Sequence, residues 1–463
     1  MELQQTNPLS TAPIGKLMVK YAVPSVVSLV VNALYNIVDQ IFIGWGVGTL
    51  GNSATNVIFP LSVIVVALSL LLGDGGAAYL SLESGRNNRE KAQKGVNCTI
   101  LWLIIVAVIV FVLCFIFLEP VTSVLGSTPD NKPYVLSYGR IIVIGFPFAI
   151  VGSGLSSIIR SDGSPHITMI GMIAGCITNV ILDAVFVLGF KWGMEGAAIA
   201  TVIGQLLNLI ITLCYIPHFK TVKITVKEMK LDFKMLAKIS SLGISSFVSQ
   251  FAVAVVTAVT NYYLVRYGAM TKYGSDIPMA AFGIVMKFNT ILVSIVTGIG
   301  TGSQPIIGYN YGSSDFKRVK KTFFVACRAA TIVAVICFII FQVFPKQLTA
   351  IFGSQGELYT EFSIMAFRTF SLLCFVDGFQ IVSAIFFQSI GKALISGIIS
   401  FSRQIIFLIP AIMILCPIIG LKGVVLAGPV ADGLAFILAL ILVIYEVKNL
   451  NRLEQKSLKE KSK

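Results

Sequence analysis

Twelve long apolar runs dominate this sequence of 463 residues. Each run is about 20–25 residues long, the length that a helix needs to cross the roughly 30 Å hydrocarbon core of a membrane. Backbone groups in lipid must pair within their own segment, so each run is expected to be a helix. The sequence therefore predicts an all-α polytopic membrane protein. The runs lie at 21–44, 56–80, 96–118, 134–158, 167–189, 196–217, 240–264, 279–303, 323–345, 363–387, 394–417 and 423–445.

Composition agrees with this fold class. Hydrophobic residues make up 56% of the chain and charged residues 12%, whereas soluble domains carry about 25% charged residues. The eight cysteines form no CxxC pair, and no P-loop, HExxH or GxSxG motif occurs. We therefore expect no enzymatic activity, no cofactor and no use of ATP.

The basic residues report the orientation of the chain in the membrane. The net charge is +14, which in a soluble protein would indicate nucleic-acid binding. Here 24 of the 35 Lys and Arg residues fall in the tails and in the loops on the same side, against eight on the opposite side. Because basic loops stay in the cytoplasm, the sequence predicts two cytoplasmic termini, a multi-pass membrane location and no nucleic-acid partner.

The two halves of the chain resemble each other at a shift of about 227 residues. At this shift, Gly73, Gly75 and Gly85 fall on Gly300, Gly302 and Gly312. Two repeats of six spans predict two pseudo-symmetric lobes around a central pathway, as in transporters that work by alternating access. The predicted segments are a cytoplasmic tail at 1–20, a first lobe at 21–217, a linker at 218–239, a second lobe at 240–445 and a basic tail at 446–463.

Four acidic residues lie well inside the predicted spans: Asp39, Asp183, Asp377 and Asp432. An acid at the centre of a span costs roughly 2.5–3.5 kcal/mol on insertion scales, so each needs a reason to be there. A fifth acid, Asp74, stands among glycines near an expected helix end, and we predict a structural role in a turn for it.

Polar side chains in three spans of the first half repeat at helical spacing and so form polar faces. Such faces are costly in lipid and should turn inward and meet, although packing between helices could also explain the amides and the threonine. The faces comprise Asn32, Asn36 and Asp39 with the adjoining Tyr35; Asn179 and Asp183; and Thr201, Gln205 and Asn208.

The two halves differ in how their buried acids can be neutralised. The second half has Lys287 and Arg403 beside Asp377 and Asp432, whereas the first half has no Lys or Arg deep in a span. Asp39 and Asp183 must therefore be neutralised by protons, by a metal cation or by a cationic substrate. We predict that these two residues carry ion coupling.

The sequence resembles the multidrug and toxic compound extrusion (MATE) family, in particular its MepA-type bacterial branch. The resemblance spans about 16–446. Its motifs are YNIVDQIFIG at 35–44, GDGGAAYLSLESGRNNREKA at 73–92, TNVILDAVFVLG at 178–189, GAAIATVIGQ at 196–205 and FVDGFQIVSAIFFQSIGK at 375–392.

This resemblance implies a V-shaped pair of lobes and a monomeric antiporter that exports cationic, lipophilic drugs in exchange for H⁺ or Na⁺. Asp39, Asn179, Asp183 and Thr201 match the family's first-lobe cation site, where Na⁺ would be the metal ion. Asp377 matches a second-lobe acid of the sodium-coupled branch, but 240–264 lacks the acid of that branch. The protein is expected to be surrounded by membrane lipids. Further candidates for the substrate cavity are Asn32, Tyr35, Asn36, Gln205, Asn208, Asp377, Gln380 and Lys287.

The alternative function is a flippase for lipid-linked precursors, or a narrow metabolite exporter, of the same superfamily. Flippases of this kind carry cationic residues that bind phosphates, and Lys287 and Arg403 could serve this purpose.

Overall fold

In the computed structural model, the described residues are 8–125, 127, 129, 131–225, 229–274, 276–351 and 356–461, and within these ranges every regular element is a helix. The α-helices are α1 Pro8–Thr11, α2 Ile14–Gly46, α3 Thr49–Gly85, α4 Arg89–Ile116, α5 Leu118–Val124, α6 Lys132–Ser161, α7 Pro165–Asp183, α8 Gly193–Cys214, α9 Phe233–Gly268, α10 Asp276–Gly312, α11 Phe316–Val343, α12 Pro345–Ala350, α13 Glu357–Phe370, α14 Asp377–Ser389, α15 Ala393–Phe401, α16 Ile409–Ile419 and α17 Leu421–Lys461. Two π-helical segments, η1 Ala184–Gly189 and η5 Ser402–Leu408, extend α7 and join α15 to α16.

Eleven helices of the described chain are long and apolar enough to cross a membrane. A twelfth span is formed by α13 and the segment Cys374–Ser389, which meet at a bend of 44°. The predicted all-α, twelve-span fold class is confirmed.

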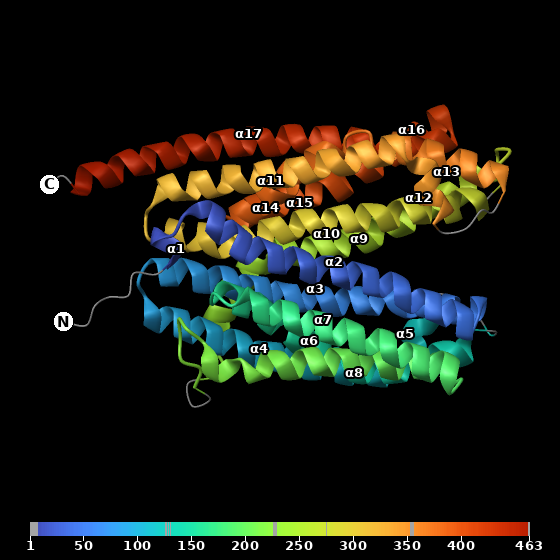
Figure 1. Ribbon diagram of the computed structural model, residues 1–463, viewed down its shortest axis with the longest axis horizontal. Coiled ribbons are helices and arrows are strands. Elements are labelled where there is room, and N and C mark those ends of the chain that lie inside the picture. The colour runs from blue at the N-terminus through green and yellow to red at the C-terminus, as the bar shows by residue number, and fades with distance from the viewer. Residues whose placement is uncertain are drawn as a thin grey trace.

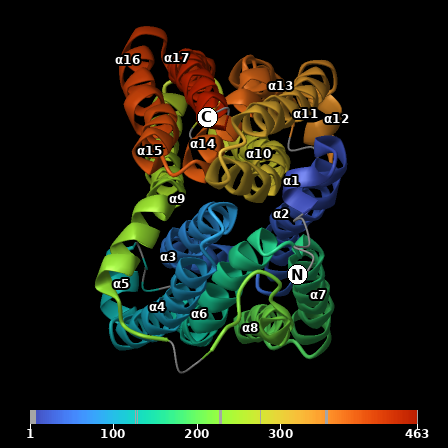
Figure 2. The same cartoon turned by 90° about the vertical axis from the view of Figure 1, so that its left-hand side faces the viewer.

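The helices form two lobes that follow the order of the chain (Figures 1 and 2). Helices α2–α8 form the first lobe and α9–α17 the second. Helices α2 and α9 each contact both lobes. Helix α2 packs on α7 of its own lobe and on α10 of the other, and α9 packs on α15 of its own lobe and on α3 of the other (Figure 2). The predicted segment boundaries stay predictions: α9 already begins at Phe233 and α17 continues unbroken through 446–461.

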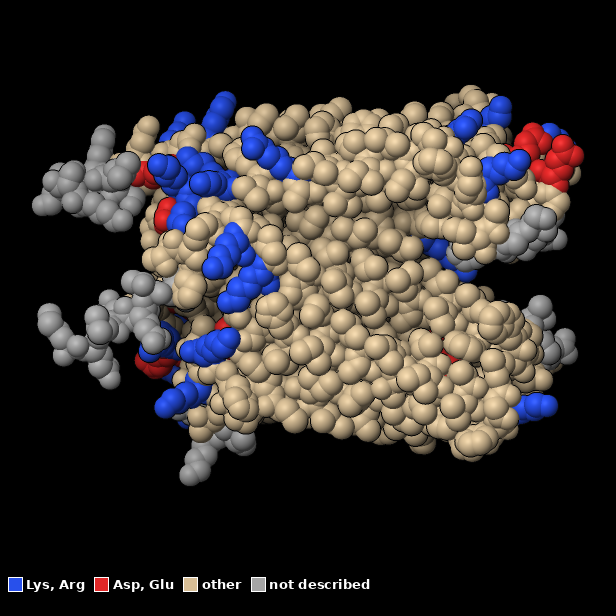
Figure 3. Space-filling model, viewed as in Figure 1, with Lys and Arg blue, Asp and Glu red and all other residues tan. Residues whose placement is uncertain are grey.

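Helix α1 and the last turns of α17 lie at the same end of the bundle, which we call the terminal end (Figure 1). Lys and Arg side chains gather at this end, whereas the surface between the ends is almost entirely uncharged (Figure 3). At the opposite end, which we call the far end, the surface is hollowed between the lobes.

The lobes meet backbone to backbone in the half of the bundle near the terminal end. A β-carbon at Gly75 of α3 would overlap the carbonyl oxygen of Ile239 on α9, and one at Gly243 of α9 would overlap the carbonyl oxygen of Leu71 on α3. Only glycine permits helices to approach this closely. We call this inter-lobe contact, together with the α2–α10 and α3–α10 contacts described next, the glycine seam.

The glycine seam follows the sequence repeat. Gly302, the counterpart of Gly75, packs on the backbone of Ala22 on α2, as Gly75 packs on α9. The counterparts Gly85 and Gly312 meet each other, and a β-carbon on either one would lie 3.0 Å from the other's Cα. The shift of about 227 residues therefore relates residues with equivalent packing roles.

The structural turn role predicted for Asp74 is wrong. Helix α3 continues past this residue to Gly85, so Asp74 lies inside a helix rather than at its end. The surrounding glycines do not break the helix because Gly73, Gly75 and Gly76 each pack closely on a neighbouring element.

Replacing Gly243 with Ala is expected to lower the free energy of unfolding by about 1–3 kcal/mol, because the new methyl group must push α3 and α9 apart. Gly283 on α10 is the matched control, since no other atom lies within 4 Å of the position of its β-carbon. Gly283→Ala should retain stability, because Ala favours the helix. Thermal unfolding of the two variants in detergent measures the difference, and equal midpoints would contradict the close seam.

Candidate functional site

Polar side chains from α2, α7 and α8 meet inside the first lobe, in the half nearer the far end. Asp39 comes from α2, Asn179 and Asp183 from α7, and Thr201 from α8, and all four are buried. The Asn179 amide donates a hydrogen bond to the Thr201 hydroxyl at 3.3 Å, and the Tyr35 hydroxyl of α2 lies 3.4 Å from the same oxygen. The structure thus brings together the four residues predicted for the cation site. We call them the first-lobe site.

Close helix packing and a local change of helix type position this site. A β-carbon at Gly175 of α7 would lie 2.7 Å from the carbonyl oxygen of Gly204 on α8, so only glycine permits this approach, and it places Asn179 beside Thr201. Asp183 is the last residue of α7, and the π-helical segment η1 begins directly after it. Single π-helical turns within α-helices are frequent at functional sites.

The first-lobe site contains two acids and no base. The carboxyl groups of Asp39 and Asp183 lie close enough for electrostatic interaction with each other. Within the described chain, no Lys or Arg pairs with either acid, and no donor lies within hydrogen-bond distance of Asp39 Oδ1, Asn179 Oδ1 or either Asp183 carboxylate oxygen. A buried cluster of acceptors without donors fits a proton or a cation.

Tyr138 of α6 belongs to the same environment and was missed in the sequence analysis. Its side chain is buried and lies close enough to Asp39, Asp183 and Tyr35 for electrostatic interaction. The sequence gives little signal for it, because no amide or carboxyl residue stands three or four positions away on α6.

Gln205 and Asn208, on the same face of α8 as Thr201, lie between helices. Gln205 Oε1 would stand 2.5 Å from a β-carbon at Gly145 of α6. Asn208 Oδ1 would stand 2.6 Å from a β-carbon at Gly171 of α7, and its amide nitrogen 3.2 Å from one at Gly152 of α6. This placement favours polar packing for these two side chains, and their role in a substrate cavity stays a prediction.

Three other cavity candidates lie toward the boundary between the lobes. Asn36 is exposed on α2 and donates to the backbone oxygen of Asn32 at 2.7 Å and to its side-chain oxygen at 3.0 Å. Lys287 is partly buried on α10. No contact described for these residues assigns them to a substrate.

The buried acids of the second lobe share one arginine. Arg403, in the π-helical segment η5, donates from Nε to Asp432 Oδ1 at 2.8 Å and from Nη2 to Asp377 Oδ2 at 3.3 Å. The predicted internal neutralisation is therefore made by Arg403. Gln380 is buried one turn after Asp377, and its Oε1 has no donor within the described residues.

A transition-metal centre finds no support in the described part of the chain, where no three His, Cys, Asp or Glu side chains lie together as a metal-binding group. The first-lobe site instead offers carboxylate, amide and hydroxyl oxygens, which are the ligands that hard cations prefer.

Comparison with known proteins gives consistent results. Residues 24–185 and 245–414 match the family model MatE. The chain is 25% identical to the multidrug export protein MepA of Staphylococcus saprophyticus, over 96% of each chain, and 25% identical to MepA of Staphylococcus haemolyticus, over 99% of this chain and 100% of that one.

A solved structure described as the outward-facing conformation of a multidrug resistance MATE family transporter has the same fold. It aligns with a TM-score of 0.90 at 19% identity and covers 98% of this chain and 100% of that chain. These matches confirm the resemblance inferred from the sequence motifs. The chain therefore belongs to the MatE family.

Proposed function

We propose that this protein is a secondary active antiporter that exports cationic or lipophilic compounds in exchange for protons. The observation that carries the proposal is the pair of neighbouring buried acids, Asp39 and Asp183, which no Lys or Arg of the described chain neutralises. An ion that binds there does not have to displace a tethered base, because no Lys or Arg of the described chain pairs with either acid.

The electrostatic interaction between the two carboxyl groups favours a proton over Na⁺. A proton can lie between two carboxyl oxygens and remove their repulsion. Sodium would bind the same oxygens together with Asn179 and Thr201, and it is the alternative coupling ion. In either case, a cationic substrate and the coupling ion compete for the same negative charge, which makes their binding mutually exclusive.

The two-lobe fold supports alternating access. The glycine seam closes the terminal half of the bundle, and the surface is hollowed at the far end (Figure 3). A ligand shifts such a two-state protein only if it binds the two states with different affinity. Proton binding at the first-lobe site would supply that difference.

The distribution of charge supports a bacterial cell-membrane location with both termini in the cytoplasm. Basic side chains gather at the terminal end (Figure 3), as the positive-inside rule requires of the cytoplasmic side. With this orientation, the glycine seam closes the cytoplasmic half of the bundle. In this proposal the protein works as a monomer, because the two lobes of one chain together form the transport pathway.

One cation that supported the flippase alternative is committed elsewhere. Arg403 makes ion pairs with both Asp377 and Asp432, so its charge is not available for a phosphate.

Asp39→Asn and Asp183→Asn should each abolish proton-coupled efflux, because a side-chain amide does not bind and release a proton at physiological pH. Ethidium uptake into everted vesicles energised by respiration, with and without a protonophore, measures the loss. Asp232→Asn is the matched control: Asp232 caps α9 by accepting from the Met235 backbone nitrogen, and Asn caps helices equally well.

All three variants should reach the membrane in similar amounts. Full efflux by both site variants would contradict the proposed coupling residues. An absence of efflux of any organic cation by the unmodified protein would instead favour the flippase or the narrow exporter.

Purified protein in proteoliposomes should make the lumen more alkaline when a cationic substrate is added outside, because protons leave as the substrate enters. The change should be equally large in sodium-free buffer. A pH-sensitive dye enclosed in the vesicles measures this exchange. A strict requirement for sodium in the same assay would show that the coupling ion is Na⁺ and not the proton. The first-lobe site would still be the proposed binding site.

A further inference from the structure

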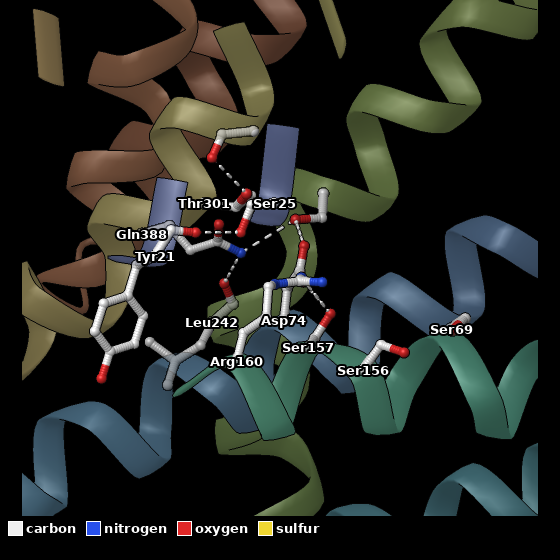
Figure 4. A network of polar contacts seen from close by, with 12 residues as sticks. Tyr21, Ser25, Ser69, Asp74, Ser156, Ser157, Arg160, Leu242, Thr301 and Gln388 are labelled. Atoms are coloured by element: carbon white, nitrogen blue, oxygen red, sulfur yellow. Dashed lines mark hydrogen bonds and ion pairs between the residues drawn. The ribbon is translucent and has the colours of Figure 1, made fainter. Parts of the chain in front are cut away.

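A further buried acid, Asp74 of α3, forms the centre of a hydrogen-bond network that crosses the boundary between the lobes (Figure 4). Its Oδ1 accepts from the Ser157 hydroxyl of α6 at 2.7 Å, and its Oδ2 accepts from the Ser246 hydroxyl of α9 at 2.8 Å. Ser157 belongs to the same lobe as Asp74, and Ser246 belongs to the other lobe. One carboxylate therefore connects the two lobes.

Each serine is held by a nitrogen donor from its own lobe. Arg160 Nη2 donates to Ser157 Oγ at 2.9 Å, and Gln388 Nε2 of α14 donates to Ser246 Oγ at 3.2 Å. Gln388 Nε2 also donates to the Leu242 backbone oxygen at 3.0 Å, which fixes the amide against α9. Both hydroxyls are thereby polarised toward the carboxylate, and hydrogen bonds in such a chain strengthen one another.

The network also neutralises the charge of Asp74. Arg160 Nη2 lies 3.7 Å from Asp74 Oδ1, and both side chains are largely buried. This arrangement differs from the first-lobe site, where the acids have no base. Asp74 therefore has no need of an exchangeable cation, and a role in ion coupling is not the reason for its position.

The network lies within the glycine seam. Asp74 stands next to Gly75, which packs on α9, and Ser246 stands one turn after Gly243, which packs on α3. Any motion that opens the terminal half of the bundle must separate α3 from α9 and so must break the bond between Asp74 and Ser246. The bonds to Ser157 and Arg160 lie within the first lobe and survive that motion.

We propose that Asp74 and Ser246 form an inter-lobe latch that stabilises the state closed at the terminal end. The proposal rests on the proposed alternating access, since a latch has a function only if the lobes move. In this mechanism, Arg160 of the first lobe stays paired with the carboxylate in both states. Gln388 keeps Ser246 oriented, so that the latch re-forms when the lobes close.

Double electron–electron resonance between spin labels on the two lobes tests the latch. Lys91 of α4 and Lys321 of α11 are exposed and lie close to the terminal end, and labels are attached to Lys91→Cys and Lys321→Cys in a transport-competent background without native cysteines. Ser246→Ala should lengthen the inter-label distance for a larger share of the molecules. Loss of a hydrogen bond to a charged group predicts a shift of about tenfold in the ratio of the two states.

Two further variants separate the latch from a general loss of structure. Ser157→Ala removes the equivalent bond to the other Asp74 oxygen within one lobe, and the distance distribution should stay close to that of the parent. Ser246→Thr keeps the hydroxyl and should restore the parent distribution. Equal shifts from Ser157→Ala and Ser246→Ala, or no shift from Ser246→Ala, would overturn the latch.

The same experiment distinguishes a failure of the latch from a failure of the proposed function. If the parent protein shows two distances whose ratio responds to pH or to ethidium, the lobes move and the Ser246 variants judge the latch alone. If the parent shows one distance under all these conditions, alternating access fails and the latch fails with it.

Discussion

The cost of a buried charge is the constraint on which this structure depends. A carboxylate inside a bundle surrounded by lipid must be paired, hydrogen-bonded or neutralised by a bound ion. The chain uses a different solution at each of three places. Arg403 pairs with Asp377 and Asp432, the serines and Arg160 satisfy Asp74, and Asp39 and Asp183 lie near each other without a base in the described chain. Only the last arrangement leaves a charge that an exchangeable ion can neutralise.

The distribution of these acids breaks the symmetry that the glycines keep. Gly75 and Gly302 pack in equivalent ways on the opposite lobe, and Gly85 meets its own counterpart Gly312. At the same shift, however, Asp74 falls on Thr301 and Asp183 falls on Pro410. The backbone scaffold is therefore duplicated, whereas the chemistry is not. Two lobes of similar shape can close in similar ways while, in the proposed mechanism, one of them holds the exchangeable ion.

The sequence predicted the features that depend on one helix at a time. The twelve spans followed from hydrophobic length, and the polar faces that carry Asp39, Asn179 and Asp183 followed from helical spacing, because both are local properties. Features that depend on contact between distant helices were harder to predict. Tyr138 lies near the first-lobe site on α6, where no amide or carboxyl residue stands one turn away. The sequence showed that the second half has bases for its two acids, but it did not show that Arg403 pairs with both.

Asp74 shows most clearly why the sequence is insufficient. Neighbouring glycines usually indicate a turn, and this reading assigned Asp74 to a helix end. In the folded chain, the same glycines mark the faces along which α3 approaches other helices. A glycine in a membrane helix can signal close packing instead of a break, and the local sequence does not distinguish the two cases. The partner that decides between them, α9, lies in the other half of the chain.

The positions of Asp74 and of the Asp39–Asp183 pair relate the two ends of the molecule. The pair lies in the half nearer the far end, and Asp74 lies in the closed half near the terminal end. Helix α2 connects these regions directly, because it carries Asp39 and also packs on α10 at Ala22 and Val26 within the glycine seam. A change in charge at Asp39 therefore acts on a helix that is itself part of the seam. Ion binding at one end and closure at the other can be coupled through this single element, without a chain of intermediate contacts.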